Sequence, residues 1–382
     1  MKRWAVLAVF LLAQAAFGQR HKLGTVNAET PEGALLQQIG QEADAGKKVA
    51  LMEEFAAKFP KHEGAGWVLL QLQGAYSKAN QFDKTLEVGD KLLALDPDDV
   101  ETAHQNLKAA EGKKDLDLIV KWSGATAQIA PKVAAEPQPK DEDEVDYWKH
   151  RVDFAKQVVA YTEYSLFNAA LTTQDGRKKV QLLETLQQRN PKNAYAAQIP
   201  GLVFTTYRQL GDNDKAVATA EQILTADQSN EDMLLVVAFN YLQKNQQLDK
   251  VLTYSTKLVE VMTSKPKPEG IADADWTARK NQLIGLGHYM IGSVYMNQSK
   301  FAPADETLRR ALPLVDTNAD MKAETLFNLA LANFKLGEST KNTQRILDAI
   351  KFNEQCAALK SRFQAKAAQN LKVIRAQYRV TK

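Results

Sequence analysis

Residues 291–312 read IGSVYMNQSKFAPADETLRRAL, and the spacing of small and large side chains in this stretch predicts two helices joined by a turn. Small side chains at Gly292 and Ala304 allow two antiparallel helices to approach closely, while larger ones such as Leu308 fill the space between them. Pro303 falls in the first turn of the second helix, where its missing N–H leaves no hydrogen bond unmade. We therefore expect an antiparallel helix hairpin in which Gly292 and Ala304 face each other.

The same stretch resembles a repeat of the tetratricopeptide (TPR) family, whose pattern is L-G-x2-Y … A-x3-F-x2-A. The matching residues are Ile291, Gly292, Tyr295, Ala304, Leu308 and Ala311. Comparable patterns are centred on Tyr76, Tyr207, Tyr241 and Phe334. The resemblance implies an all-α fold without strands, namely a right-handed α-solenoid (a TPR-like superhelix) of stacked antiparallel helix hairpins.

An internal duplication supports the repeat interpretation, because the sequence matches itself without a gap when it is shifted by 131 residues. The matching pairs include Lys47-Lys48-Val49 with Lys178-Lys179-Val180, Glu53 with Glu184, Pro60-Lys61 with Pro191-Lys192, Tyr76 with Tyr207, and Asp83-Lys84 with Asp214-Lys215. The chain thus contains two copies of a three-hairpin module, at about 33–131 and 164–262, followed by two further hairpins. The first hairpin of each copy departs from the family pattern, so the predicted number of repeats lies between five and eight.

These patterns divide the chain into seven segments. They are a signal peptide at 1–18, an N-terminal TPR-like module at 31–131, a linker rich in proline and acidic residues at 132–146, a second TPR-like module at 147–262, a Pro-rich loop at 263–276, C-terminal TPR hairpins at 277–352, and a capping helix with a tail at 353–382. The stretch after Pro131 is either an exposed connector or the start of a long helix. The capping helix is expected to run without a partner from about Asn353, as the polar end of the stack.

The N-terminus has the order of features that defines a secretory signal. Lys2 and Arg3 precede an apolar run that ends in small residues, and cleavage is expected after Gly18 or after Ala15, with Gly18 preferred. The alternative is an uncleaved membrane anchor, but the apolar run is well short of the roughly 20 residues that a spanning helix needs. We therefore expect a periplasmic or secreted protein with a Sec-type signal peptide.

Composition argues against several classes of partner. The formal net charge is +3, and cleavage would remove two of the positive charges, so the mature chain lacks the excess of basic residues typical of nucleic-acid or anionic-membrane binders. No other segment is apolar enough for membrane insertion after cleavage. Cys356 is the single cysteine, so no intrachain disulfide can form, and its helical surroundings predict a small buried apolar residue.

The sequence carries no pattern that predicts catalysis, a metal site or a cofactor. The five histidines stand singly, and none has a partner at the i, i+4 spacing that places two ligands on one helix face. Gly285-x-Gly287 lacks both the third glycine and the preceding strand of a phosphate-binding loop, so close packing of helices is the better interpretation. The acidic cluster at Asp96-Pro97-Asp98-Asp99 is explained as a turn between repeats rather than as a calcium loop.

The TPR resemblance implies that the first helices of successive hairpins line a concave surface, whose exposed residues choose the ligand. Mapping that surface gives Gln198, Thr205, Arg208, Gln209, Phe239, Gln243, Tyr289, Ser293, Asn297, Asn328 and Lys335. The alternative for each of these residues is an ordinary exposed helix position. The Lys and Asn pairs with which some relatives clamp a C-terminal carboxylate are absent from this surface.

Three hypotheses for function follow from these patterns. The first is a non-catalytic scaffold or adaptor of the cell envelope that binds a protein or peptide partner through the concave face. The second is a self-associating structural or assembly factor of the envelope, which would show a concentration-dependent mass. The third is an enzyme, which would need a convergent set of titratable groups that the sequence does not offer.

Overall fold

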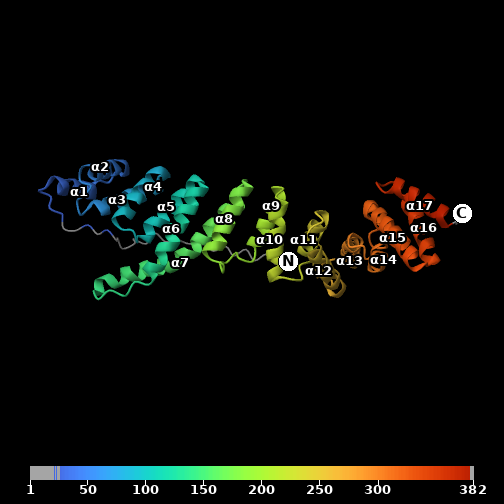
Figure 1. Ribbon diagram of the computed structural model, residues 1–382. Helices are drawn as coiled ribbons and strands as arrows, with labels where there is room; N and C mark the ends of the chain where they lie inside the picture. Colours follow the sequence, from blue (N-terminus) through green and yellow to red (C-terminus); the bar gives the residue numbers. More distant parts are fainter. Residues whose placement is uncertain (1–20, 22, 24–25, 379–382) are drawn as a thin grey trace. The chain divides into compact units, whose positions relative to one another are not determined.

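The computed structural model describes residues 21, 23 and 26–378, so the predicted signal peptide and both cleavage sites lie outside the described residues. Within these ranges every regular element is an α-helix, and the seventeen helices follow one another without a strand (Figure 1). The prediction of an all-α fold is therefore confirmed. Most helices begin at a residue whose side chain accepts a hydrogen bond from the first turn, such as Asp44, Asp99 and Asn230.

The chain divides into two compact units, at 1–199 and 200–382. The helices of the first unit are α1 (Pro31–Gln41), α2 (Ala45–Lys58), α3 (Ala65–Lys78), α4 (Phe82–Leu95), α5 (Val100–Lys113), α6 (Leu116–Ala134), α7 (Glu142–Thr172) and α8 (Gly176–Arg189). The division falls at the start of α9 (Ile199–Gln209), inside the predicted second module. Because each hairpin of a repeat array contacts only its neighbours, compact units need not coincide with copies of a duplication.

The second unit continues through one helix after another to the end of the described chain. Its helices after α9 are α10 (Asn213–Ala226), α11 (Glu231–Gln243), α12 (Leu248–Ser264), α13 (Asp273–Asn297), α14 (Phe301–Ala311), α15 (Ala319–Thr340), α16 (Thr343–Ala357) and α17 (Gln364–Tyr378). Helices α1 to α16 make eight consecutive pairs, which is the upper end of the predicted range. The final helix α17 follows the last pair.

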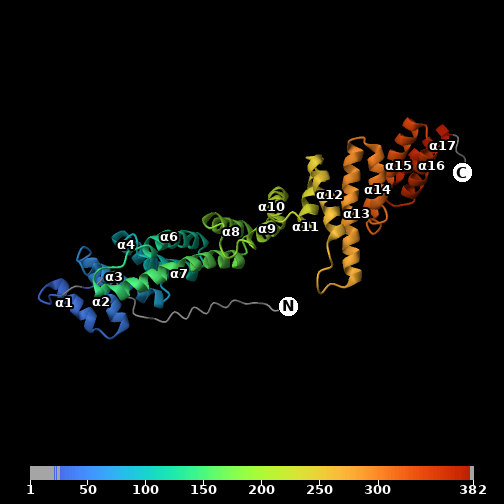
Figure 2. The same cartoon turned by 90° about the horizontal axis from the view of Figure 1, so that it is seen from below.

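Within each unit, successive helices pack side by side, as Figures 1 and 2 show for α3 to α6 and for α13 to α16. The first helices of neighbouring hairpins also contact one another, α3 with α5 and α5 with α7 in the first unit, and α11 with α13 and α13 with α15 in the second. This layer of first helices is the arrangement expected of an α-solenoid. It places the candidate binding residues of adjacent hairpins next to each other.

The duplication seen in the sequence reappears in the helix boundaries. Shifted by 131 residues, α2 coincides with α8 and α4 with α10 at both ends, and the end of α1 coincides with the end of α7. The N-cap residues Asp44 of α2 and Asp175 of α8 also correspond. The two copies therefore fold with closely matching helix boundaries, and the first part of α7 is an addition to the second copy.

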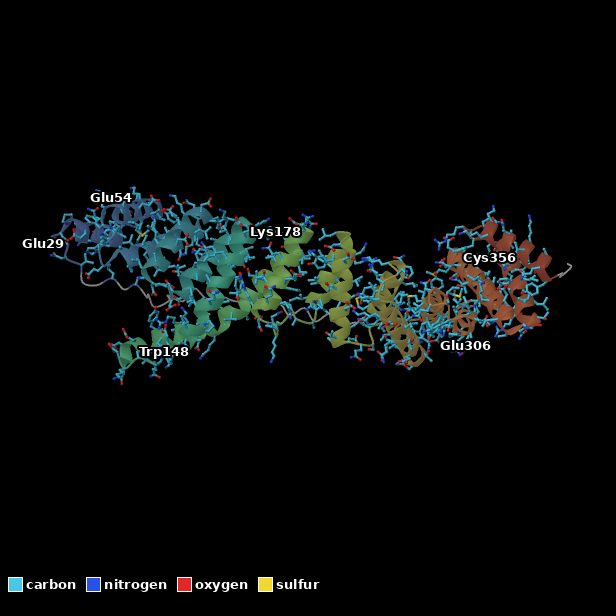
Figure 3. All side chains as sticks on the ribbon, in the orientation of Figure 1. Glu29, Glu54, Trp148, Lys178, Glu306 and Cys356 are labelled. Carbon is cyan, nitrogen blue, oxygen red and sulfur yellow. The ribbon has the colours of Figure 1, made fainter. Side chains whose placement is uncertain are left out.

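Two predicted boundaries differ from the structure. The predicted linker at 132–146 is helical at both ends, because α6 continues to Ala134 and α7 begins at Glu142 with its N-cap on Asp141, which confirms the alternative that a long helix starts here. Pro131 lacks the N–H that would bond one turn back, and α6 ends three residues after it. Figure 3 shows Trp148 in the first turns of α7, where its indole N–H donates to the Glu136 carbonyl oxygen at 2.9 Å.

The predicted capping helix is also two elements. Asn353 belongs to α16, which ends at Ala357, and the cap itself starts only at Gln364. The prediction that the cap has no partner is wrong, since Ala367 and Ile374 of α17 are buried in clusters with residues of α15 and α16. The predicted tail at 379–382 lies outside the described residues.

Each unit has its own apolar core. In the first unit, Ile39, Phe55 and Leu92 are fully buried between α1, α2, α3 and α4. In the second, Leu258, Met262 and Met290 occupy the corresponding place between α12 and α13. Cys356 is also fully buried, its Sγ lies 3.3 Å from the Ala323 carbonyl oxygen, and burial raises the pKa of its thiol to about 11 (Figure 3). The interpretation of this cysteine as a buried packing residue is confirmed.

A recurring polar contact ties each hairpin to the preceding one. Glu53 of α2 accepts hydrogen bonds from the Tyr76 hydroxyl of α3 and from the Lys84 ammonium of α4, the latter at 2.7 Å. Glu221 of α10 is bound in the same way by Lys250 of α12 at 2.8 Å, and Lys250 lies 5.5 Å from the centre of the Tyr241 ring. Because these groups are partly exposed, we expect them to set the register of stacking more than its free energy.

The glycines of α13 mark its closest contacts. A Cβ on Gly287 would lie 2.5 Å from Val259 Cγ2 of α12, and one on Gly285 would lie 2.6 Å from Leu314 Cβ. The prediction that these two glycines serve helix packing is confirmed. A Cβ on Gly292 would lie 2.5 Å from Leu308 Cδ2, so the nearest neighbour of this glycine is Leu308 and not the predicted Ala304. The leucine side chain reaches back toward the N-terminus of α14 and covers the glycine.

Substitution of Gly287 by alanine is expected to destabilise the second unit by about 1 to 3 kcal/mol. The added methyl group must displace Val259 and approaches the Ser255 carbonyl oxygen, and such overpacking outweighs the helix propensity gained. Gly74, in the middle of α3, is the matched control, since a Cβ there meets no atom within 4 Å. Gly74→Ala should stabilise the first unit by about 0.5 to 1 kcal/mol in urea unfolding. Equal effects of the two substitutions would contradict the packing described for α12 and α13.

Candidate functional site

The second unit has two adjoining hollows along its first helices. The larger, of about 1030 Å³, is lined by α11, α13 and α15, and the smaller, of about 570 Å³, by α9, α10, α11 and α13. Phe239 and Gln243 of α11 line both hollows, as do Asn318 and Met321 at the start of α15. We call the two hollows together the second-unit groove.

Seven of the eleven residues predicted for the concave surface line this groove. Arg208 lies in the smaller hollow, Phe239 and Gln243 lie in both, and the larger contains Tyr289, Ser293, Asn297 and Asn328. They come from the four first helices α9, α11, α13 and α15. The repeat pattern therefore placed residues more than a hundred positions apart in the sequence on one surface.

The other four predicted residues lie elsewhere. Gln198 belongs to the first unit, where its backbone N–H donates to the Tyr195 carbonyl oxygen. Thr205 and Gln209 are exposed one turn apart on α9 and are not among the residues that line the groove, and Thr205 donates its hydroxyl to the Gly201 carbonyl oxygen. Lys335 is exposed two turns beyond Asn328, with its Nζ 3.5 Å from Glu338.

Two of the groove residues are buried rather than exposed, which corrects the prediction for them. Tyr289 is 7 % exposed and Ser293 is 8 % exposed, and the Ser293 hydroxyl donates to the Tyr289 carbonyl oxygen at 2.8 Å. Burial raises the pKa of Tyr289, and a hydrogen bond with Glu324 raises it further. The tyrosine therefore forms part of the floor of the groove and stays protonated there.

The family of the chain follows from this repeated geometry and from one sequence comparison. The family model described as "Tetratricopeptide repeat" matches residues 205–230, which contain most of α9 and α10. This chain contains a tetratricopeptide repeat. No curated protein matches the chain.

One solved structure of a TPR domain aligns with most of this chain. The crystal structure of the P58(IPK) TPR domain is 12 % identical in sequence to this TPR protein. The alignment covers 92 % of this chain and 100 % of that chain, with a TM-score of 0.25. The family assignment therefore rests on the repeat match and on the repeated hairpins, and not on this superposition.

The sequence interpretation missed several residues that line the groove of the TPR protein. Asp320, Met321 and Glu324 come from the first turns of α15, which starts at Ala319 and is longer than a standard repeat helix. The signal that could have identified them is Asn318, whose side chain accepts from the Met321 N–H at 3.0 Å and caps the helix. Arg362 was missed because the connection between α16 and α17 was predicted to be helix.

Charged and amide side chains dominate the polar part of the lining. Arg362 forms an ion pair with Glu324, with 2.6 Å between Nη2 and Oε2. The carboxamides in the lining are Asn213, Asn240, Gln243, Gln282, Asn297, Asn318 and Asn328. Each carboxamide can both donate and accept hydrogen bonds, so the groove suits the non-covalent binding of a polar chain.

Two further searches of the described residues bear on other kinds of site. In 21, 23 and 26–378, no three His, Cys, Asp or Glu side chains gather as a metal-binding group would require. Over the same ranges, no helix combines the length and the apolar character of a bilayer-spanning segment.

Proposed function

We propose that this TPR protein is a non-catalytic scaffold or adaptor of the cell envelope that binds a protein partner through the second-unit groove. The repeat fold itself is typical of protein-interaction scaffolds. The observation that carries the proposal is the convergence of α9, α11, α13 and α15 on one groove, with Phe239 and Met321 at its centre. The envelope location rests on the signal peptide expected at 1–18.

The chemistry of the lining supports binding rather than catalysis. Of its titratable groups, Glu324 is engaged by Arg362, and the raised pKa of Tyr289 makes that hydroxyl a poor base or nucleophile. Apolar side chains between them, including Leu286, offer contact area without reactive groups. Aromatic and methionine side chains surrounded by polar ones are the composition expected of a protein-binding surface.

A matched pair of substitutions tests this function. Gln243 and Gln209 are the last residues of α11 and α9, and both are exposed, but only Gln243 lines the groove. Gln243→Arg should fill the groove and abolish retention of a partner from a native envelope extract, whereas Gln209→Arg should retain it. Circular dichroism of both variants checks that the helices are intact.

The outcome that contradicts the proposal is equal retention by the two variants. Such a result would mean that the partner binds another surface. If the only protein retained is the chain itself, and the mass of the purified protein rises with concentration, the self-association hypothesis is correct instead. Intact Met1 on the mature, cell-associated protein would remove the support for export.

A further inference from the structure

The two hollows of the second-unit groove carry opposite unpaired charges. Arg208 lines the smaller hollow and is exposed, and among the described residues it has no carboxylate partner. Asp320 lines the larger hollow and is likewise exposed, with no cationic partner in the same part of the chain. Other cation and carboxylate side chains nearby are paired, as Glu324 is with Arg362 and Lys322 with Asp316.

An apolar ridge separates the two charges. Phe239 and Met321 line both hollows, and Leu286 of α13 lies beside them in the smaller one. All three are partly buried and pack on the core of the second unit, which holds them in place. Because the core supports these side chains from below, an apolar group placed on the ridge would gain contact area without reorganising it.

We propose that the groove binds an extended segment of a partner protein that carries an acidic residue, a large apolar residue and a basic residue in that spatial order. The acidic side chain pairs with Arg208, the apolar one rests on Phe239, Leu286 and Met321, and the basic one pairs with Asp320. This inference rests on the proposed function and adds to it the chemistry and the orientation of the partner. The carboxamides beside the ridge supply hydrogen bonds to the backbone of the bound segment.

The charges define a direction as well as a composition. A segment bound in the reverse orientation would place its acidic group beside Asp320 and Glu324, and its basic group beside Arg208. Like charges at those positions disfavour the reversed complex, so the charges should fix the direction in which a given segment lies in the groove and should reject a segment with the same charge at both ends. Screening by salt should reduce that distinction, since both charges are exposed.

Synthetic peptides of three charge patterns provide the test. One set carries Glu, Phe and Lys at increasing spacings in a Gly/Ser background, a second set carries Glu on both sides of Phe, and a third replaces Glu and Lys with Gln. Binding is measured by fluorescence anisotropy at low salt. We expect the intact protein to bind the set with Glu and Lys roughly ten-fold more tightly than the set with two Glu residues, with the neutral set between them.

Charge reversal in the protein should switch the preference. Asp320→Lys leaves two cations in the groove and should make the protein prefer the set with two Glu residues by a similar factor, whereas Arg208→Glu should weaken the binding of that set further. Lys335→Glu and Glu260→Lys are matched controls, because both residues are exposed on helices of the same unit but do not line the groove. These controls should leave the preference unchanged.

Two results would overturn the inference. Peptides that bind without a preference for charge pattern, or whose preference survives Asp320→Lys, would show that the charges do not select the partner. Absence of binding to any peptide would show that the groove does not take this kind of segment. In either case the scaffold function is tested separately. It is supported if Gln243→Arg abolishes partner retention while Gln209→Arg does not, and contradicted if the two variants retain the partner equally.

Discussion

Replacing Asp305 with alanine is expected to lower the free energy of unfolding of the second unit by about 3 kcal/mol. Asp305 of α14 is 4 % exposed and accepts hydrogen bonds from Arg309 Nε at 2.8 Å, from Asn333 Nδ2 of α15 at 2.6 Å, and from Arg345 of α16. One carboxylate thus joins three consecutive helices. Its loss would remove one acceptor each from the buried Asn333 amide, which keeps only the Leu329 carbonyl oxygen, and from the Arg345 guanidinium, which keeps Asn333 Oδ1. Buried groups with fewer partners are costly.

The expected value lies at the lower end of the range for broken buried pairs. Both arginines are more than a third exposed, so water can solvate part of each guanidinium, and Arg309 keeps its second partner, Asp348, at 2.7 Å. The loss of protection should be local, because each hairpin is stabilised mainly by its neighbours. Hydrogen exchange should therefore increase in α14, α15 and α16 while the first unit stays protected.

The neighbouring residue provides the control for Asp305. Glu306 is exposed and bonds only to Arg310, one turn along the same helix, at 2.6 Å (Figure 3). Surface pairs of this kind contribute little, so Glu306→Ala should change the free energy of unfolding by less than about 0.5 kcal/mol. If Asp305→Ala is as mild as Glu306→Ala, the carboxylate does not hold the three helices together.

The repeat register explains why so much of the fold could be predicted from the sequence. Small residues at Gly285, Gly287 and Gly292 and the gapless duplication are local signals, and they specify hairpins before any long-range contact is known. The contact of Gly292 was predicted less well, since its partner depends on the direction of the Leu308 side chain. Consensus spacing gives positions on a helix face, but rotamers decide which side chains meet.

The groove was predicted in part for a similar reason. Phe239, Gln243 and Asn297 were found because they occupy equivalent positions on standard repeat helices. Asp320 and Arg362 were missed because one belongs to the extra first turns of α15 and the other to a connection, where the repeat pattern gives no register. Partner selection is proposed to depend on two charges, and one of them belongs to Asp320, which lies outside the repeat consensus.

The buried polar network of Asp305 and the surroundings of His104 could not be predicted from the sequence, for a different reason. His104 of α5 is 7 % exposed, and its ring meets Phe154 and Tyr161 of α7 edge-on at centroid distances of 5.5 and 4.9 Å. Tyr161 lies in α7 just before the second copy of the module, so no local pattern connects it with His104. Only the packing of α5 against α7 creates the site.

The first unit is expected to lose stability as the pH falls from about 6.5 to about 4, because of His104. Burial, with a smaller contribution from Lys108 and an opposing one from Glu111, lowers the pKa of His104 from 6.5 to about 4. Its Nδ1 has no hydrogen-bond partner among the described residues. The neighbouring Lys108, Glu111 and Tyr161 are bonded to one another, with Tyr161 donating to Glu111 at 2.6 Å, so the Glu111 carboxylate is already engaged.

Acid lowers the stability of the first unit here because the unfolded state binds more protons at His104 than the folded state does. Below pH 6.5 the unfolded chain protonates this histidine while the folded chain keeps it neutral, so acid favours unfolding until the folded form also protonates near pH 4. The full difference corresponds to about 3 kcal/mol. Stability that is present above pH 6.5 is therefore lost progressively across this window, and recovered when the pH is raised.

Comparison with His104→Leu isolates this effect from that of the carboxylates. Glu53, for example, has a lowered pKa and also contributes acid sensitivity, but mainly below pH 4.5 and equally in both proteins. Urea unfolding monitored by hydrogen exchange of α5, α6 and α7 should give a difference between the two proteins that narrows, or reverses in favour of the variant, as the pH falls from 7.5 to 4.5. A difference that stays constant across this range would show that His104 is protonated as easily in the folded protein as in the unfolded chain, and that its apolar enclosure between α5 and α7 is not maintained in solution.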